Sequence, residues 1–109
     1  MHGLYYDPKH GGCLRRIWRA GPDTYRIVGV YGSDETPHTH RSWYAQARVV
    51  SRSATKWGLV VDFAGKPIKP DRFLTASFEP GKRRIRWEDG NTWQGLFYHA
   101  SQLQGGTGQ

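Results

Sequence analysis

Residues 72–98 read RFLTASFEPGKRRIRWEDGNTWQGLFY, and two turn signals within this stretch decide the fold class. Glu79-Pro80-Gly81-Lys82 predicts a type II turn, because proline presets φ near about −65° and the glycine accepts the positive φ that must follow. The Asp89-Gly90 pair is typical of a two-residue hairpin turn. The segments around both turns are rich in aromatic and branched residues, so the stretch predicts a three-stranded antiparallel meander.

The Asp-Gly turn also predicts a register for the last hairpin. A two-residue type I′ loop places Arg86 opposite Trp93, with the guanidinium over the indole ring as a cation–π pair. The alternative is that Trp93 belongs to the core and Arg86 extends past it. A longer loop shifts the register by one residue and exchanges the two faces of this strand.

The rest of the chain also alternates between apolar and polar residues. Residues 57–63 form the best candidate for a core strand, with one face made of Trp57, Leu59, Val61 and Phe63. Residues 42–50 predict a second strand whose apolar face begins at Trp43, and Gly29 in another strand predicts a bulge or a close neighbour. No window of a dozen residues has helical periodicity free of glycine or proline.

These patterns predict an all-β fold, a small single-domain antiparallel barrel or sandwich of about seven to eight short strands. The domain is expected to span residues 1–103, and the glycine-rich residues 104–109 to form a flexible tail.

The composition favours acidic partners. The 109 residues include sixteen Lys and Arg and nine Asp and Glu, which gives a net charge of +7. Such a charge suits nucleic acid, an anionic membrane surface or an acidic protein face, and the alternative is a basic domain that is merely soluble. Cys13 is the single cysteine, so no intramolecular disulfide can form, which fits a reducing intracellular compartment. No apolar run approaches transmembrane length, and we expect no membrane insertion.

Four stretches resemble a group of small all-β domains found in proteins of algae and related protists. They are VVDFAGK at 60–66, IRWEDGNTW at 85–93, LYYDPKH at 4–10 and LRRI at 14–17. The group has no assigned function, and the resemblance implies an all-β fold over most of residues 3–98. Its motifs are turns with their flanks, so they bring no catalytic residue to this chain. At residues 66–70 the chain has KPIKP where the group has a longer glycine-rich connection.

Metal binding and catalysis are both weakly indicated. His38 and His40 are two residues apart, and with His10 and Cys13 they are the weak candidates for a tetrahedral zinc site. No CxxC or HExxH framework supports them, so we expect no metal and no cofactor. There is no nucleophile elbow or phosphate-binding glycine loop, and the adjacent carboxylates lie in predicted turns. We therefore expect a protein that is not an enzyme.

Basic residues interleaved with aromatic residues are the strongest functional signal. The candidate binding residues are Lys82, Arg83, Arg84, Arg86, Trp87, Trp93, Arg15, Arg16 and Trp18. On one β surface they predict docking on an acidic protein surface or larger assembly, where Arg and Trp are favoured anchors. The same residue types serve sequence-tolerant binding of single-stranded nucleic acid, which is the alternative. Carbohydrate binding by Trp93, Asn91 and Gln94 is a third hypothesis.

Overall fold

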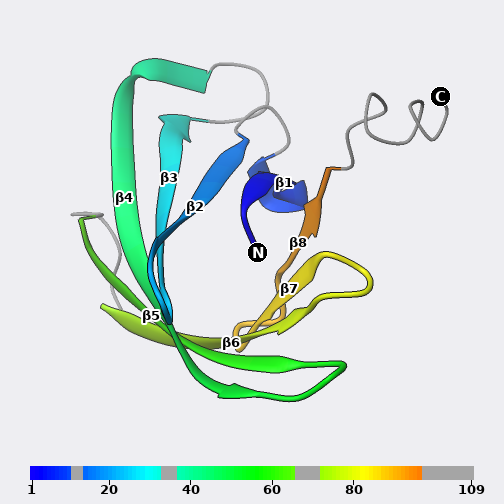
Figure 1. Cartoon of the computed structure of the whole chain (residues 1–109). Helices are drawn as coiled ribbons and strands as arrows, with labels where there is room; N and C mark the ends of the chain where they lie inside the picture. Colours follow the sequence, from blue (N-terminus) through cyan, green and yellow to red (C-terminus); the bar gives the residue numbers. More distant parts are fainter. Residues whose placement is uncertain (11–13, 33–36, 66–71, 97–109) are drawn as a thin grey trace, which may run out of the picture.

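The protein is an eight-stranded antiparallel β-barrel (Figure 1). The computed structural model describes residues 1–10, 14–32, 37–65 and 72–96, without the side chains of residues 10, 30–32 and 37–41. The strands are β1 (Gly3–Tyr6), β2 (Arg15–Gly21), β3 (Thr24–Gly32), β4 (Pro37–Arg52), β5 (Trp57–Gly65), β6 (Phe73–Glu79), β7 (Arg84–Trp87) and β8 (Thr92–Gly95). A single 3-10 turn, η1 (Pro8–His10), follows β1. The all-β prediction is confirmed, and the barrel is the architecture adopted; the predicted tail lies outside the described residues.

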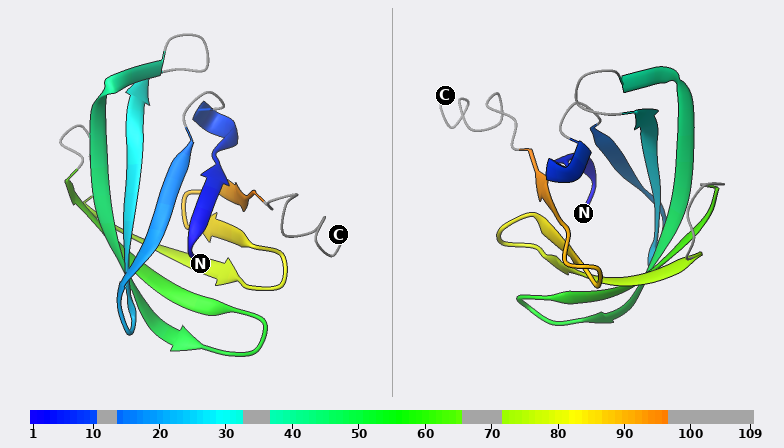
Figure 2. Two further views of the ribbon diagram at one scale, coloured as in Figure 1. Left: turned by 45° about the horizontal axis from the view of Figure 1, so that its top comes forward. Right: turned by 180° about the vertical axis from the view of Figure 1, so that it is seen from behind.

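Each strand pairs with the next along the chain, and the last pairs with the first (Figure 2). The closure between β1 and β8 aligns Tyr5 with Gly95. Beyond it the Leu96 amide donates to the Leu4 carbonyl at 2.9 Å. Closure pairs every described strand on both sides, which protects a small aromatic-rich domain from edge-to-edge association.

The barrel interior is filled by alternate residues of each strand, because successive side chains of a strand point to opposite faces. On the predicted core faces, Trp43, Leu59, Val61 and Phe63 are buried, and Trp57 is half-buried against the core. Gly29 lies opposite Trp43 in the β3–β4 ladder. A Cβ atom at Gly29 would lie 2.5 Å from Cζ2 of Trp43, so the close neighbour expected there is the indole ring.

The turn between β6 and β7 is longer than predicted. The Lys82 amide donates to the Glu79 carbonyl at 3.2 Å, and the Arg83 amide donates to Pro80 at 3.3 Å. The left-handed residue is Arg83, with φ of 50°, whereas Gly81 keeps a negative φ. The type II prediction is wrong, because residues 80–83 form a four-residue loop whose last residue carries the positive φ.

The register predicted for the last hairpin is also wrong. Arg86 pairs with Thr92 and Ile85 pairs with Trp93, so the ladder is offset by one residue. The loop has three residues, 88–90, because the Trp87 amide donates to the Asn91 carbonyl at 2.9 Å. This offset turns the Trp93 ring into the barrel, and the expected pairing of Arg86 with that ring does not form.

Candidate functional site

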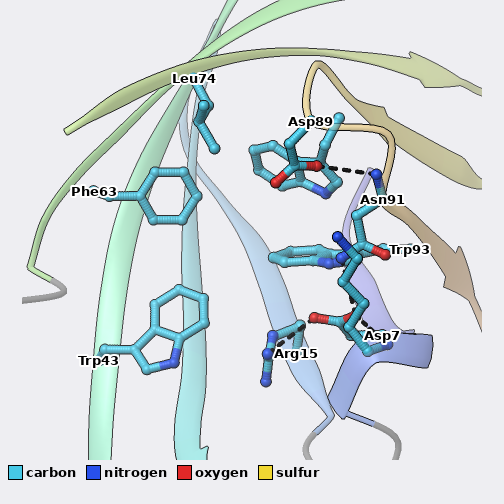
Figure 3. A pocket seen from close by; sticks show the side chains of 10 residues that line it. Asp7, Arg15, Trp43, Phe63, Leu74, Asp89, Asn91 and Trp93 are labelled. Atoms are coloured by element: carbon cyan, nitrogen blue, oxygen red, sulfur yellow. Dashed lines mark hydrogen bonds and ion pairs between the residues drawn. The ribbon is translucent and has the colours of Figure 1, made fainter. Parts of the chain in front are cut away.

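The two ends of the barrel interior differ. The end that holds the β2–β3, β4–β5 and β6–β7 turns is packed with apolar side chains, among them Tyr25, Val49 and Phe78. The opposite end, where β1 leads into η1, contains a cavity of about 140 Å³ (Figure 3). The lining residues are Asp7, Lys9, Arg15, Trp43, Phe63, Leu74, Trp87, Asp89, Asn91 and Trp93.

Four aromatic rings form a continuous wall around this cavity. Trp43 lies 6.0 Å from Phe63, and Phe63 lies 5.6 Å from Trp87, between ring centroids. Trp87 in turn lies 4.8 Å from Trp93. Figure 3 shows Phe63 and Trp43 on one side of the pocket and Trp93 on the other. The wall therefore offers ring faces and edges on opposite sides of the same space.

A buried ion pair lies beside the aromatic wall. Arg15 Nη2 donates to Asp7 Oδ2 at 3.0 Å, and the two side chains are only 2% and 3% exposed. The guanidinium of Arg15 lies 5.0 Å from the Trp43 ring and 5.4 Å from the Trp93 ring. These two cation–π contacts and the carboxylate compensate a charge that would otherwise be costly to bury.

The carboxylate of Asp7 is well satisfied by donors. Besides Arg15, it accepts a hydrogen bond from the Lys9 amide at 2.9 Å and from Asn91 Nδ2 at 3.0 Å. These contacts tie η1 and the β7–β8 loop to the start of β2. At the rim, Lys9 and Asp89 are exposed and carry opposite charges. The charges of the buried pair cancel, and so do the charges of the two rim residues.

Two donors in the wall lack acceptors. Nε1 of Trp87 and Nε1 of Trp93 are buried, and no atom of the described residues accepts a hydrogen bond from either. Buried tryptophan N–H groups usually find a partner, because an unmade hydrogen bond leaves the desolvation cost uncompensated. Almost none of either atom is accessible, so a molecule in the cavity reaches these donors only if the rings shift.

Several predicted surface residues are inside the barrel. Arg15, Trp87 and Trp93 were expected on an outer binding face, and they are 2%, 6% and 4% exposed. The proposed glycan group is also divided between two faces, because Trp93 is internal while Gln94 Nε2 donates to the Lys82 carbonyl at 2.9 Å. The predicted outer wall studded with these indoles is therefore wrong.

Two arginines of the basic run at residues 82–86 share one carboxylate. Arg84 and Arg86 both donate to Oε1 of Glu79, at 2.8 and 3.2 Å. The hydrogen bond from Arg84, and then that from Arg86, holds the pKa of the Glu79 carboxyl below its usual range. Arg83 is half-buried and donates to the His2 carbonyl at 2.9 Å, which leaves Lys82 exposed in the turn.

A different set of basic and aromatic side chains shares the outside of β2, β3 and β4. We call it the outer basic face, and its residues are Arg16, Trp18, Arg26, Tyr44 and Arg48. Neighbouring positions in the ladders bring these strands together, with Trp18 opposite Arg26. Two guanidinium–ring contacts, 5.7 Å from Arg16 to Trp18 and 5.9 Å from Arg26 to Tyr44, stiffen it. Within the described chain, no carboxylate pairs with these three arginines.

The zinc candidates are not tested by the described side chains. Cys13 and the side chains of His10, His38 and His40 lie outside them, and no three His, Cys, Asp or Glu residues cluster in the part that is described. The weak metal prediction therefore stays a prediction.

Sequence reasoning missed Asp7 and Asn91 as site residues. They are 84 positions apart, and the hydrogen bond between their side chains forms only when β1 and β8 close the barrel. No local pattern signals such a contact. Trp43 and Phe63 were recognised as apolar-face residues, but a core residue and a cavity wall have the same sequence pattern.

Comparisons of the chain with protein-family models, curated proteins and solved structures found no match, so the function is argued from geometry. None of the helices among the described residues is long and apolar enough to cross a membrane.

Proposed function

We propose that this domain is a non-catalytic binding module that holds a small molecule in the open end of its barrel. The observation that carries the proposal is a cavity of about 140 Å³ that is lined by four aromatic rings and a buried ion pair. Ligand sites are usually concave and largely apolar, with a few placed polar groups, and the mouth of a β-barrel is a common position for one.

The cavity is unlike a simple packing defect. Protein interiors are close-packed, and voids larger than a water molecule are few, because each costs stability. Two unpaired buried donors add about 1–3 kcal/mol each. A domain of this size has a total stability of only about 5–15 kcal/mol, so these costs are a large share. A ligand that fills the space offsets the cost of the cavity.

The same geometry favours recognition over catalysis. Among the described lining residues, the buried carboxylate is that of Asp7, and three donors already occupy it. Its charge is paired with Arg15 at 3.0 Å, which makes it a poor general base. The aromatic rings are suited to hold a molecule rather than to react with it.

The proposal is tested by titrating the protein with a panel of one- and two-ring aromatic compounds and following tryptophan emission. We expect saturable quenching and a raised melting temperature. Leu74→Trp fills the cavity and should abolish binding, while Leu14→Trp adds an indole at an exposed site and should not. If Leu74→Trp fails to fold, Leu74→Phe should weaken binding by a smaller amount. Absent binding, or equal binding by the Leu74 and Leu14 variants, would refute the proposal.

A second candidate function is docking on an acidic protein surface. The outer basic face supports it, because its arginines have no carboxylate partner within the described chain. Arg16 also lies beside the half-buried Trp18 ring, and Arg26 beside the exposed Tyr44 ring. Arg, Trp and Tyr are the residues most often found at interface hot spots. The candidate docking surface therefore lies on β2, β3 and β4 and not, as the sequence suggested, on β7. On β7, Arg84 and Arg86 pair with Glu79 of β6.

Poly-glutamate and a short oligonucleotide distinguish the possible partners of the outer basic face. A docking surface for acidic protein should bind poly-glutamate with an affinity that falls with salt, and Arg16→Glu with Arg48→Glu should remove that binding. Arg84→Glu with Arg86→Glu is the matched control on the other side of the barrel. Tighter, salt-dependent binding of the oligonucleotide would instead favour the nucleic-acid alternative.

A further inference from the structure

We infer that the outside of the barrel across β3, β4, β5 and β6 binds an extended acidic peptide that carries one aromatic or large apolar side chain among its carboxylates. This inference rests on the second candidate function, docking on an acidic protein surface, and names the kind of segment that docks. It follows from a row of opposed side chains, two adjoining hollows and the charges beside them.

One row of outward side chains crosses four strands. Arg26 of β3 lies opposite Gln46 of β4. Gln46 lies opposite Asp62 of β5, and Asp62 lies opposite Phe73 of β6. Asp62 is half-buried and the other three are exposed. Neighbouring strands are about 4.8 Å apart, so the row is about 14 Å long, which is the length of about four residues of an extended peptide.

Two hollows adjoin along this row. The first has a volume of about 150 Å³ and lies where a bulge shifts the β4–β5 register between Tyr44 and Gln46. The second has a volume of about 260 Å³ and reaches Phe73. Gln46 and Asp62 border both hollows, so together they form one outer groove. The main side chains of the outer groove are Arg26, Tyr44, Gln46, Arg48, Asp62 and Phe73.

An exposed aromatic ring is held in place in each hollow. Tyr44 is 54% exposed and Phe73 is 56% exposed. A Cβ atom at Gly65 would lie 2.6 Å from Cδ2 of Tyr44, so the Tyr44 ring lies directly against the Gly65 backbone. The guanidinium of Arg72 lies 5.0 Å from the Phe73 ring, and two hydrogen bonds to Asp62 hold it there. Rings that are already fixed lose little freedom on binding, so an apolar side chain of a ligand gains by packing on them.

The charges of the outer groove favour an acidic ligand. No carboxylate of the described chain pairs with Arg26 or Arg48. Arg48 lies opposite Thr24, which is two residues before Arg26 on β3, so the two guanidinium groups occupy diagonal positions on one face. The Asp62 carboxylate is matched by Arg72 at 2.9 Å. Carboxylates two residues apart in an extended peptide have the spacing to contact both arginines.

The middle of the outer groove favours a peptide over a nucleic-acid strand. The side-chain amide of Gln46 both donates and accepts, and the Asp62 carboxylate only accepts. A peptide backbone offers N–H and C=O groups to both. A phosphodiester backbone offers only acceptors, and its charge on every nucleotide places phosphate beside Asp62.

Two labelled peptides of equal charge test the inference, with affinity followed by fluorescence anisotropy. In the sequence ESESFSE, the glutamates and the phenylalanine share one face of an extended chain, and ESESSSE lacks the phenylalanine. We expect ESESFSE to bind about tenfold more tightly, which corresponds to about 1.4 kcal/mol and to partial burial of one ring. Both peptides should bind more weakly as salt rises.

Variants at exposed positions locate the contact. Phe73→Thr should bring the two peptides to within about twofold of each other, and Val60→Thr in the same hollow should also reduce the preference. Tyr6→Thr removes an exposed ring outside the outer groove and should leave the tenfold preference unchanged. Arg26→Gln with Arg48→Gln should weaken both peptides by a similar factor.

The outcomes separate the docked segment from the docking function. Equal wild-type affinity for both peptides, or an unchanged preference in both Phe73→Thr and Val60→Thr, would overturn the apolar anchor and leave docking on acidic protein in place. Tighter binding of an oligothymidine or of polygalacturonate than of ESESFSE would overturn the peptide as the ligand. If neither peptide nor poly-glutamate binds, the second candidate function itself fails.

Discussion

Asp7→Asn should be among the most destabilising single changes of a polar side chain in this barrel. The substitution keeps the shape of the side chain and removes its charge, so Arg15 remains buried without its carboxylate at 3.0 Å. Breaking a buried ion pair in this way costs about 3–5 kcal/mol, because the remaining charge keeps its desolvation penalty. Against a total of about 5–15 kcal/mol, this loss is at least a fifth of the stability and can approach all of it.

Asp62→Asn provides the matched exposed control. Asp62 accepts two hydrogen bonds from Arg72, at 2.9 and 3.1 Å, but the two side chains are 33% and 62% exposed. Exposed pairs of this kind contribute about 1 kcal/mol or less. A second control replaces both buried partners, in Asp7→Leu with Arg15→Met. Apolar replacement of a whole buried pair is often neutral, so this double variant should recover most of the loss.

Urea unfolding followed by tryptophan emission measures all four proteins on one scale. The expected order of the free energy of unfolding places wild type and Asp62→Asn close together and Asp7→Asn well below them. The double variant should lie above Asp7→Asn. The reasoning is refuted if Asp7→Asn costs no more than Asp62→Asn, or if the double variant is as unstable as the single one. Where Asp7→Asn remains folded, its cavity carries an uncompensated cation, and its affinity for an anionic aromatic compound such as 2-naphthoate should rise.

Two further changes test the packing and the titration of the interior. Gly29→Ala places a Cβ atom 2.5 Å from Cζ2 of Trp43. It should lower the free energy of unfolding in urea by about 1–3 kcal/mol, and it should weaken ligand binding because it displaces the Trp43 ring. A variant as stable as the wild type would contradict the close approach. Burial raises the pKa of Tyr5 to about 12 from an ordinary value of 10. The contribution of the neutral Tyr5 phenol to the free energy of unfolding is therefore complete below pH 10 and is lost as the pH rises toward 12. The free energy of unfolding should fall by at most about 3 kcal/mol over this range of pH. Tyr5→Phe should reduce this dependence on pH. A Tyr5→Phe variant with the same dependence on pH would show that Tyr5 does not cause it.

The fold class was predictable because alternation with a period of two survives in single strands. Residues 57–63 carry an apolar face that needs no partner to be recognised, and the turn residues mark where strands end. The choice of a barrel over a sandwich was not predictable, because it depends on the pairing of Tyr5 with Gly95 at opposite ends of the chain. The contacts between β1 and β8 distinguish a closed sheet from two open ones.

The site was less predictable, because one residue more or less in the β7–β8 loop decides which side chains of β8 point into the barrel. Asp89 Oδ1 accepts from the Asn91 amide at 3.0 Å, and Asn91 Nδ2 donates to Asp7 at 3.0 Å. These bonds accompany the three-residue loop, and the resulting register turns Trp93 inward. Arg15 shares the inward face of β2 with Ile17, but an arginine is normally exposed, and its buried acceptor lies in the β1–β2 connection, so its burial was not predicted.

The contrast between the two ends of the barrel limits which molecules the proposed site can hold. Because Tyr25 and Phe78 fill the far end, a ring that enters beside Trp93 must leave by the way it came. Any chemical group attached to that ring has to project past Lys9 and Asp89 into water. The geometry thus suits the terminal ring of a longer molecule as well as a free one, provided that the remainder is joined at the outward edge.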